Sequence, residues 1–243
     1  MITGDFMNID TTSFEVERIR NVYFSRYKHV NLYRYTPFDP AHLLLHFSRQ
    51  KALLNAFKKH GIYNLEGKQI LDVGCGAGNI LSEYIEYGAD PKNIFGVDIL
   101  DEDLKKANSR YPYFGLLCGN CQTLPFPDNY FDIVTQYTVF TSILNYEIKK
   151  CVASEMLRVL KPRGLIVFYD FWPNNPANPN VKGVNIQQVK SLFPSCNFYV
   201  QNIVLAPPIA RLIAPWSTLL CQIFEKIPWL CSHYLVGISN SIT

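Results

Sequence analysis

The sequence of 243 residues lacks an apolar run long enough to cross a membrane. The longest uncharged apolar-rich stretch of the tail, residues 212–224, is shorter than the ~20 residues that a spanning helix needs, and Pro215 interrupts it. The first ten residues lack the apolar segment of a secretory signal peptide. Internal repeats and low-complexity tracts are also missing. These absences argue against a membrane-spanning or secreted protein.

Neither sign of charge dominates the chain. Its net charge is +3 and charged residues make up 18%, which gives no argument for nucleic-acid binding. Seven cysteines are an odd number, so a disulfide framework is not expected and we expect a reducing, cytoplasmic location. Apolar residues make up 48%, which is enough to bury a core and excludes a largely disordered chain.

The middle of the chain alternates apolar runs with amphipathic segments, a pattern typical of a doubly wound α/β sheet. The expected helices span residues 41–60, 79–87, 101–110, 146–160 and 186–193. The expected strands span residues 68–73, 94–99, 114–118, 131–137, 165–171, 198–205 and 233–238. These strands are near-continuous apolar runs, as in a sheet covered on both faces.

Two segments lie outside this alternation. We expect residues 1–40 to form an irregular arm that packs on the core or folds over a ligand. Its aromatic and basic residues are Phe14, Arg18, Arg20, Tyr23, Phe24, Arg26, Tyr27, Lys28, Tyr33, Arg34, Tyr35 and Phe38. We divide the chain into an N-terminal arm and helix, residues 1–60, and a main α/β domain, residues 61–243, that includes the second segment outside the alternation.

The second segment is an apolar, helical insertion before the final strand, residues 206–232. One interpretation is a lid whose apolar side chains, Trp216 among them, face inward over the carboxyl ends of the fourth and fifth strands. A shallow membrane contact, a dimer surface and plain cover of the core are the alternatives.

The most informative segment is the glycine-rich turn in ILDVGCGAGN, residues 70–79. Gly74, Gly76 and Gly78 follow an expected strand and precede an expected helix, so the backbone can turn tightly and approach a ligand closely. Asp98, twenty residues after Gly78, ends the second strand and can accept both hydroxyl groups of a ribose. The pattern predicts a nucleoside cofactor, and a tight turn without a ligand is the alternative.

The spacing of the glycines distinguishes two such cofactors. The turn reads G-x-G-x-G, whereas a dinucleotide site reads G-x-G-x-x-G. Asp72, two residues before the first glycine, would repel a pyrophosphate but suits an ammonium group. S-adenosylmethionine carries a ribose, an ammonium group and a sulfonium cation, and no phosphate. The turn therefore favours S-adenosylmethionine over NAD.

Residues 68–172 resemble the class I S-adenosylmethionine-dependent methyltransferases, especially the bacterial enzymes that act on small molecules. The matching motifs, in the family's order, are LDVGCGAG (71–78), GVDI (96–99), GNCQTLPF (119–126), FDIV (131–134) and LKPRG (160–164). Asn120 stands where the family usually has an acid, and Arg163 replaces a turn glycine. The resemblance implies a Rossmann-like sheet of seven strands, the last of them antiparallel.

The resemblance also implies the cofactor-binding residues. It assigns the methionine moiety to Asp72, Gly74, Gly76 and Gly78, with Gln136 near its end, and it adds Cys75 as a further cofactor-binding residue. It assigns the ribose and adenine to Asp98, Ile99, Asn120 and Cys121.

Other polar side chains remain as candidates. Asp170 ends the fifth strand, where it either orients or deprotonates a methyl acceptor or caps a loop. His42 and His46 share a helix face, and Cys118 and Cys121 form a lone C-x-x-C, but a third metal ligand is not evident for either pair, so no metal is expected. His233 is a weaker candidate for a base.

Together these features predict methyl transfer from S-adenosylmethionine to a small molecule, most simply to a hydroxyl oxygen of a sugar, a lipid-linked compound or a secondary metabolite. The segment after the fourth strand lacks the Asn-Pro-Pro-Tyr run that would favour nucleobase or amide methylation. The alternatives are an NAD-dependent oxidoreductase and a non-catalytic module that keeps the cofactor fold.

Overall fold

The computed structural model of this chain describes residues 6–26, 36–176 and 178–240. They contain a seven-stranded sheet in the spatial order β3-β2-β1-β4-β5-β7-β6. Its strands are β1 (Ile70–Val73), β2 (Ile94–Asp98), β3 (Gly115–Cys118), β4 (Phe131–Tyr137), β5 (Leu160–Phe171), β6 (Cys196–Leu205) and β7 (Cys231–Asn240). Neighbouring strands are parallel except at β7, which is antiparallel to β5 and β6. The expected sheet and its antiparallel last strand are confirmed.

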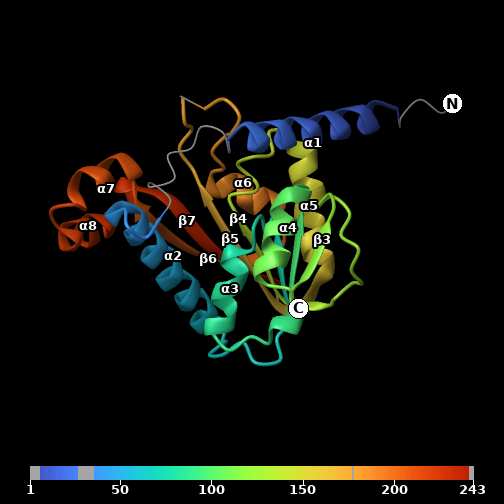
Figure 1. The fold of residues 1–243 in the computed structure, drawn as a ribbon, viewed down its shortest axis with the longest axis horizontal. Coiled ribbons are helices and arrows are strands. Elements are labelled where there is room, and N and C mark those ends of the chain that lie inside the picture. Colours follow the sequence, from blue (N-terminus) through green and yellow to red (C-terminus); the bar gives the residue numbers. More distant parts are fainter. Residues whose placement is uncertain (1–5, 27–35, 177, 241–243) are drawn as a thin grey trace.

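Helices cover both faces of this sheet (Figure 1). They are α1 (Phe6–Arg26), α2 (Pro40–Lys59), α3 (Asn79–Glu86), α4 (Asp101–Arg110), α5 (Tyr146–Val159), α6 (Ile186–Leu192), α7 (Pro207–Ile213) and α8 (Thr218–Glu225), with short 3-10 turns η2 (Pro91–Asn93) and η3 (Pro228–Leu230). The expected helices are all present, with ends that differ by no more than one residue.

Alternate residues of the central strands point to opposite helical layers, as the pleat of a strand requires. In β4, Ile133 belongs to the buried cluster that contains side chains of α2, α3 and α4, whereas the adjacent Val134 belongs to the cluster that contains side chains of α5 and α6. Val167 and Phe168 of β5 repeat this division. The central strands are therefore apolar on both faces because each face is covered.

Helix α1 corrects the expectation of an irregular arm. Its 21 residues contain no glycine or proline, so nothing in the sequence interrupts the helix. Its apolar residues have no strong helical period, which is why the pattern did not indicate it. Part of the expected arm, Tyr27, Lys28, Tyr33, Arg34 and Tyr35, lies outside the described residues.

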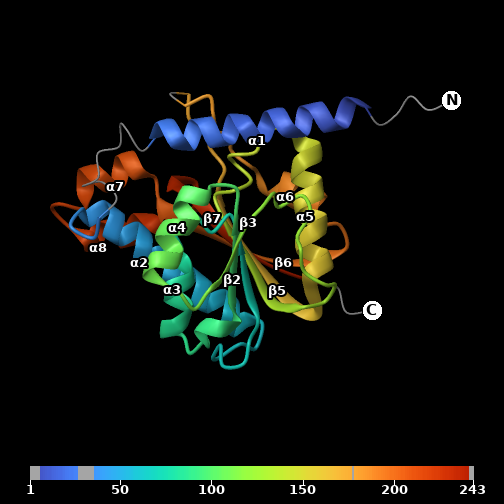
Figure 2. The same cartoon turned by 45° about the vertical axis from the view of Figure 1, so that its right-hand side comes forward.

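Helix α1 crosses the carboxyl edge of the sheet (Figure 2), and two charged side chains fix it there. Arg18 donates to the Ser142 carbonyl at 2.6 Å and to the Asn180 carbonyl at 3.3 Å. The Glu15 carboxylate accepts the Leu144 N–H and also pairs with Arg18. Burial alone would raise the pKa of Glu15, but Arg18 and the Leu144 N–H outweigh it and lower that pKa. Helix α1 therefore joins the loop after β4 to the loop after β5.

The insertion before β7 does not lie as a lid over β4 and β5. Its helices α7 and α8 pack on the start of α2 and the end of β6, the edge strand. Ala210, Ala214 and Cys221 form the buried side of this contact. Trp216, expected to face inward, is 89% exposed, so its inward placement was wrong. The turn Pro215–Ser217 carries this side chain away from the small buried cluster.

A buried ion pair joins α2 to α3. The Nη2 of Arg49 lies 2.5 Å from Glu83 Oε1, and both side chains are almost fully buried. The guanidinium also lies 5.4 Å from the centre of the Tyr137 ring, and His46 Nε2 lies 3.1 Å from the same Glu83 oxygen. Helix α2 therefore contributes to the interior of the sheet domain by charge as well as by apolar contact, and the expected division at residue 60 stays a prediction.

We predict that Arg49→Met lowers the free energy of unfolding by about 3–5 kcal/mol, because it leaves the Glu83 carboxylate buried without its cation. The double variant Arg49→Met/Glu83→Leu should regain most of this loss, since two apolar groups can replace a buried pair at little cost. Urea denaturation followed by circular dichroism measures both. Lys150→Met, which removes an exposed ion pair with Glu147, is the control and should leave stability unchanged. A double variant no more stable than Arg49→Met would contradict this account of the pair.

Candidate active site

The crevice that suits a ligand lies where the strand order reverses. β1 pairs with β2 on one side and with β4 on the other, and all three strands run in the same direction. The loops that leave their carboxyl ends therefore diverge to opposite faces of the sheet. In open α/β sheets, ligands bind in the crevice between such loops.

The glycine turn after β1 occupies one wall of this crevice. The N–H groups of Gly74 and Cys75 donate to the Val97 carbonyl at 2.7 and 3.2 Å, which fixes the turn to β2. Gly74 has a φ of +76°, and a Cβ there would collide with the Val139 side chain. Gly76 has a φ of +50°, and a Cβ there would meet no atom within 4 Å. The turn is thus packed at Gly74 and open at Gly76, as a backbone that cradles a ligand would be.

The side chain of Cys75 points into the protein. A Cβ on Gly96 would lie 2.5 Å from its Sγ, so the thiol fills the space that this glycine leaves beside β2. Burial, together with the nearby Asp72 and Asp98 carboxylates, raises the pKa of the thiol. The Sγ of Cys75 therefore belongs to the core, and the expected contact of this residue with the cofactor stays a prediction.

Asp98, at the end of β2, holds two turns together. Its Oδ2 accepts the Gly76 N–H and its Oδ1 accepts the Leu100 N–H, both at 2.8 Å. Burial raises the pKa of this carboxyl, and the N–H groups of Leu100 and Gly76 oppose that effect. Each carboxylate oxygen has a second lone pair, so these contacts leave acceptor capacity for ribose hydroxyl groups.

A cavity of about 400 Å³ lies beside Asp98, between α1 and the start of α4. Arg20 and Phe24 of α1 form one wall, and Ile99, Leu100 and Cys118 form the other. Arg20 Nε donates to the Ile99 carbonyl at 3.2 Å, so α1 closes part of this space. The structure thus adds residues of α1 to the end of the site where the resemblance assigns the adenine.

The segment expected at the adenine folds as a tight turn. Asn120 Oδ1 accepts the Gln122 N–H at 3.0 Å, and the largely buried Cys121 packs with core residues of β1, β2 and β4. Gln122 Nε2 is buried and has no hydrogen-bond partner among the described residues. An unpaired buried donor is costly, so it fits a site that a polar ligand completes.

Asp72 lies within β1, below the glycine turn. It is almost fully buried, and the Thr135 hydroxyl donates to its Oδ1 at 2.7 Å. Burial raises its pKa to about 7; the nearby Asp98 raises it further, and Thr135 and Arg49 oppose the rise. A cation bound at the turn would favour the ionised carboxylate.

Gln136 is fully buried, and both ends of its amide are engaged within the protein. Its Nε2 donates to the Tyr169 carbonyl at 3.2 Å, and its Oε1 accepts the Val139 N–H at 3.0 Å. The next loop begins at Thr138, which has a φ of +58°. Gln136 thus braces the loop that packs against Gly74, and its expected contact with the methionine moiety stays a prediction.

The carboxylate of Asp170 accepts backbone N–H groups, as expected if it caps a loop. Its Oδ2 accepts the Thr141 N–H at 3.2 Å, its Oδ1 accepts the Phe171 N–H at 3.0 Å, and the side chain is fully buried. Burial raises its pKa to about 7. Burial lowers the pKa of the neighbouring Lys149 to about 8, and Asp170 opposes that effect. The carboxylate thus braces the loop after β4, and its expected role toward a methyl acceptor stays a prediction.

Sequence reasoning missed Arg49, Tyr84 and Tyr137. The two phenol oxygens lie 3.0 Å apart, and Arg49 Nη1 is buried without a partner among the described residues. A signal was present, because Arg49 falls on the buried face of α2 with Ala52, Leu53 and Ala56. A cation at such a position requires a partner, and the apolar periodicity alone does not supply one.

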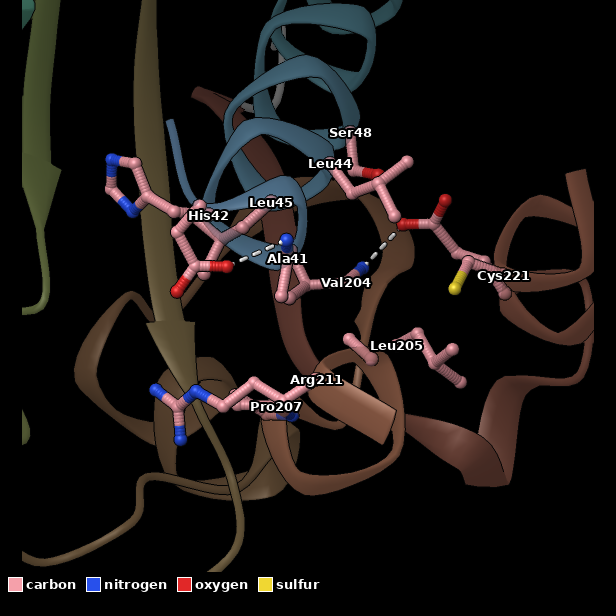
Figure 3. Close-up of a pocket in the computed structure, with 13 residues that line it drawn as sticks. Ala41, His42, Leu44, Leu45, Ser48, Val204, Leu205, Pro207, Arg211 and Cys221 are labelled. Carbon is pink, nitrogen blue, oxygen red and sulfur yellow. Dashed lines mark hydrogen bonds between the residues drawn. The ribbon is translucent and has the colours of Figure 1, made fainter. Parts of the chain in front are cut away.

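The remaining candidates do not form a metal site within the described part of the chain. Residues 6–26, 36–176 and 178–240 contain no group of three or more His, Cys, Asp and Glu side chains placed to hold a metal ion. His42 lines a small cavity of about 70 Å³ between α2, the end of β6 and the insertion (Figure 3). His233 stacks on Tyr169, with 5.4 Å between ring centres. Cys118 is exposed and Cys121 is buried.

Residues 71–168 match a protein family described as "Methyltransferase domain". Among curated proteins, the chain is 31% identical to tRNA N(3)-cytidine methyltransferase METTL2 of Gallus gallus over 142 residues, 55% of this chain and 36% of that protein. It is 33% identical to phthiotriol/phenolphthiotriol dimycocerosates methyltransferase of Mycobacterium tuberculosis over 120 residues, 46% of this chain and 41% of that protein. It is also 33% identical to the ubiquinone/menaquinone biosynthesis C-methyltransferase UbiE of Paraburkholderia phytofirmans over 110 residues, 43% of this chain and 44% of that protein.

Solved structures share the fold at low identity. The chain is 14% identical to an S-adenosylmethionine-dependent methyltransferase from Mesorhizobium loti, with a TM-score of 0.55 and coverage of 77% of this chain and 97% of that one. It is 17% identical to the [4+2]-cyclase SpnF, with a TM-score of 0.56 and coverage of 81% and 84%. The alignments span less than half the length of the curated relatives named above. Residues 71–168 therefore match a methyltransferase domain, and the sheet around them has the fold of S-adenosylmethionine-dependent methyltransferases of known structure.

Proposed function

We propose that this protein transfers a methyl group from S-adenosylmethionine to a hydroxyl oxygen of an apolar small molecule. The observation that carries the proposal is the glycine turn, with Gly76 open to the crevice and its N–H fixed by Asp98. Two of the curated relatives support an apolar acceptor, because their names refer to dimycocerosates and to ubiquinone and menaquinone. The METTL2 relative is named for a tRNA, and the chain's net charge of only +3 is the argument against that substrate class here.

The residues of the crevice fit S-adenosylmethionine. The Asp72 carboxylate lies below the turn, where it would attract the ammonium and sulfonium cations of the cofactor. The Asp98 carboxylate would accept hydrogen bonds from the ribose hydroxyl groups. Arg49 Nη1 and Gln122 Nε2 are buried donors without partners among the described residues, and they suit the cofactor's carboxylate and adenine. When bound, the cofactor supplies an electrophilic methyl group on a sulfonium sulfur.

The chain's own contribution would be to position the acceptor and exclude water. Such positioning is worth up to roughly 7–11 kcal/mol in well-aligned reactions. Helix α1 covers the carboxyl edge, and the Glu15 and Arg18 contacts hold the loop after β4 in place. We assign Asp170 to positioning that loop through the Thr141 N–H. We also place the protein in the cytoplasm, supported by its seven cysteines, all of them free.

Calorimetric titration of the purified protein with S-adenosylmethionine and, separately, with NAD tests the cofactor. We expect binding of the first and none of the second, because the turn lacks the dinucleotide spacing. Transfer of labelled methyl groups to hydroxylated lipids, with mass spectrometry of the product, then tests the acceptor. Binding of NAD alone would refute the proposal, and binding of S-adenosylmethionine without transfer to any acceptor would indicate a non-catalytic module.

Asp98→Asn should weaken S-adenosylmethionine binding about tenfold or more, since charge-assisted hydrogen bonds are worth roughly 1.5–3 kcal/mol. An amide has one oxygen, so it cannot accept both the Gly76 and Leu100 N–H groups. Calorimetry measures the affinity, and a thermal melt reports whether the variant is folded. Glu66→Gln, in the exposed loop before β1, is the control and should bind normally. Unchanged affinity in folded Asp98→Asn would remove Asp98 from the ribose site.

The affinity for S-adenosylmethionine should rise as the pH increases toward and through 7. Burial raises the pKa of Asp72 to about 7, so below that pH the carboxyl is protonated and attracts the cofactor's cations less. Below the pKa of Asp72, the affinity should fall by at most about tenfold for each pH unit. Titrations should stay below about pH 7.5, because α-amino groups such as the cofactor's lose their proton near 8.

Asp72→Asn should flatten this pH profile. Asp170→Asn is the matched control, since the pKa of Asp170 is also raised to about 7 but its carboxylate faces the loop after β4. The control should keep the wild-type slope. A flat wild-type profile, or a slope that disappears only in Asp170→Asn, would show that Asp72 does not face the cofactor.

A further inference from the structure

The insertion between β6 and β7 exposes a group of large apolar side chains within 18 residues of chain. They are Leu212, Trp216, Leu219, Leu220, Ile223 and Trp229. The two tryptophans are 89% and 78% exposed. Such a concentration on one segment differs from the scattered single apolar residues that normal surfaces carry, and it marks a contact site.

Helix α8 shows that this exposure is not required for folding. Its inward contacts are made by Cys221, which is buried with Ala210 and Ala214 of the preceding segment, and by the half-buried Phe224. Leu219, Leu220 and Ile223 are exposed, and their spacing of three and four residues places them on one stripe of the helix. A helix with polar residues on that stripe would bury the same core. Within the part of the chain that the structure describes, the outer stripe therefore has no partner.

The tryptophans stand at two separate turns at one end of the molecule. Trp216 lies between α7 and α8, and Trp229 lies in η3, each directly after a proline. Figure 1 places α7 and α8 at the extreme left of the long axis, beyond the sheet. Tryptophan is the side chain that favours the boundary between lipid headgroups and acyl chains, because one end of its ring system is polar.

The charges around these side chains complement phosphate groups. Arg211 and Lys226 are exposed at the ends of α7 and α8. Glu225, the one acid of residues 206–232, has its Oε1 turned inward, where it accepts the Val204 N–H at 2.6 Å. A symmetric dimer through this surface would bring arginine and lysine of two copies together without an outward carboxylate to pair them. A phospholipid surface offers anionic oxygens to both cations.

We propose that α7, α8 and η3 form a docking surface for a phospholipid bilayer. The apolar side chains enter the headgroup–acyl boundary, and Arg211 and Lys226 lie at the level of the lipid phosphates. Among residues 6–26, 36–176 and 178–240, no helix is long and apolar enough to cross a membrane, so the contact is in the plane of the surface. This binding does not depend on methyl transfer.

Sedimentation of the full chain with vesicles tests the proposal. Two vesicle types serve as probes, phosphatidylcholine alone and phosphatidylcholine mixed with phosphatidylglycerol. We expect the wild-type chain to sediment with both, and more strongly with the second because of the two cations. The vesicle partition coefficient of the double variant Trp216→Ser/Trp229→Ser should be at least about tenfold lower than that of the wild type. The reason is that burial of each indole contributes more than about 1 kcal/mol.

A matched control removes an exposed aromatic ring elsewhere. Tyr63 is 79% exposed in the loop before β1, at the opposite edge of the sheet, and Tyr63→Ser should sediment as the wild type does. Thermal melts should be unchanged in both variants because the altered side chains are exposed. Calorimetry with S-adenosylmethionine on the same samples reports the proposed function separately, so a loss of one property is distinguished from a loss of the other.

Three results would overturn the proposal. The first is a folded wild-type chain that stays in the supernatant with both vesicle types. The second is equal sedimentation of wild type and the double variant, which would locate the lipid contact elsewhere. The third is a dimer in analytical ultracentrifugation without vesicles that the tryptophan substitutions dissociate, which would make a second copy of this chain the partner.

Discussion

The carboxylate of Asp98 is the contact on which the proposed cofactor end of the site depends. Its two oxygens accept N–H groups from the turn after β1 and from the turn after β2, so one side chain fixes both walls at the carboxyl edge. The glycine turn is further constrained by Gly74, whose missing side chain lets Val139 approach. The loop after β4 is thereby joined to the same unit. A turn held from both sides is formed before any ligand arrives, which reduces the ordering that binding must impose.

The elements that are determined by interactions between residues close in sequence could be predicted. The apolar runs of β1, β4 and β5 and the glycine spacing at residues 74–78 are local patterns, and the structure confirms the sheet they predict. Helix α1 was not predictable, because Glu15 and Arg18 fix it through loops more than 120 residues away in sequence. The contacts of Gln136 were also not predictable. A polar residue at a strand end suggests a ligand contact, but the side-chain amide of Gln136 is hydrogen-bonded to the Tyr169 carbonyl and the Val139 N–H.

Proteins with this fold share the position of the ligand site, but they do not all share the same reaction. Structural neighbours that share this sheet at 14–17% identity include one named as a methyltransferase and one named as a cyclase. Differences among such proteins arise in the elements around the crevice. Here those elements are α1 and the loops after β4 and β5, and Arg18 touches both loops through Ser142 and Asn180. Asp170 is enclosed by one of these loops, because its carboxylate accepts the Thr141 N–H.

The topology also explains why the insertion lies at the same edge of the sheet as the candidate site. β7 is antiparallel to β6, so the connection between them begins and ends at the carboxyl edge of the sheet. A short hairpin would suffice to join two such strands, yet residues 206–230 form two helices and a 3-10 turn with apolar side chains on both the inner and outer sides. The inner side is satisfied by α2 and the end of β6. An outer apolar side is a liability in water unless a partner covers it. A bilayer at this position would lie beside the edge at which α1 and the crevice open, and an apolar acceptor could then approach from the lipid phase with little exposure to water.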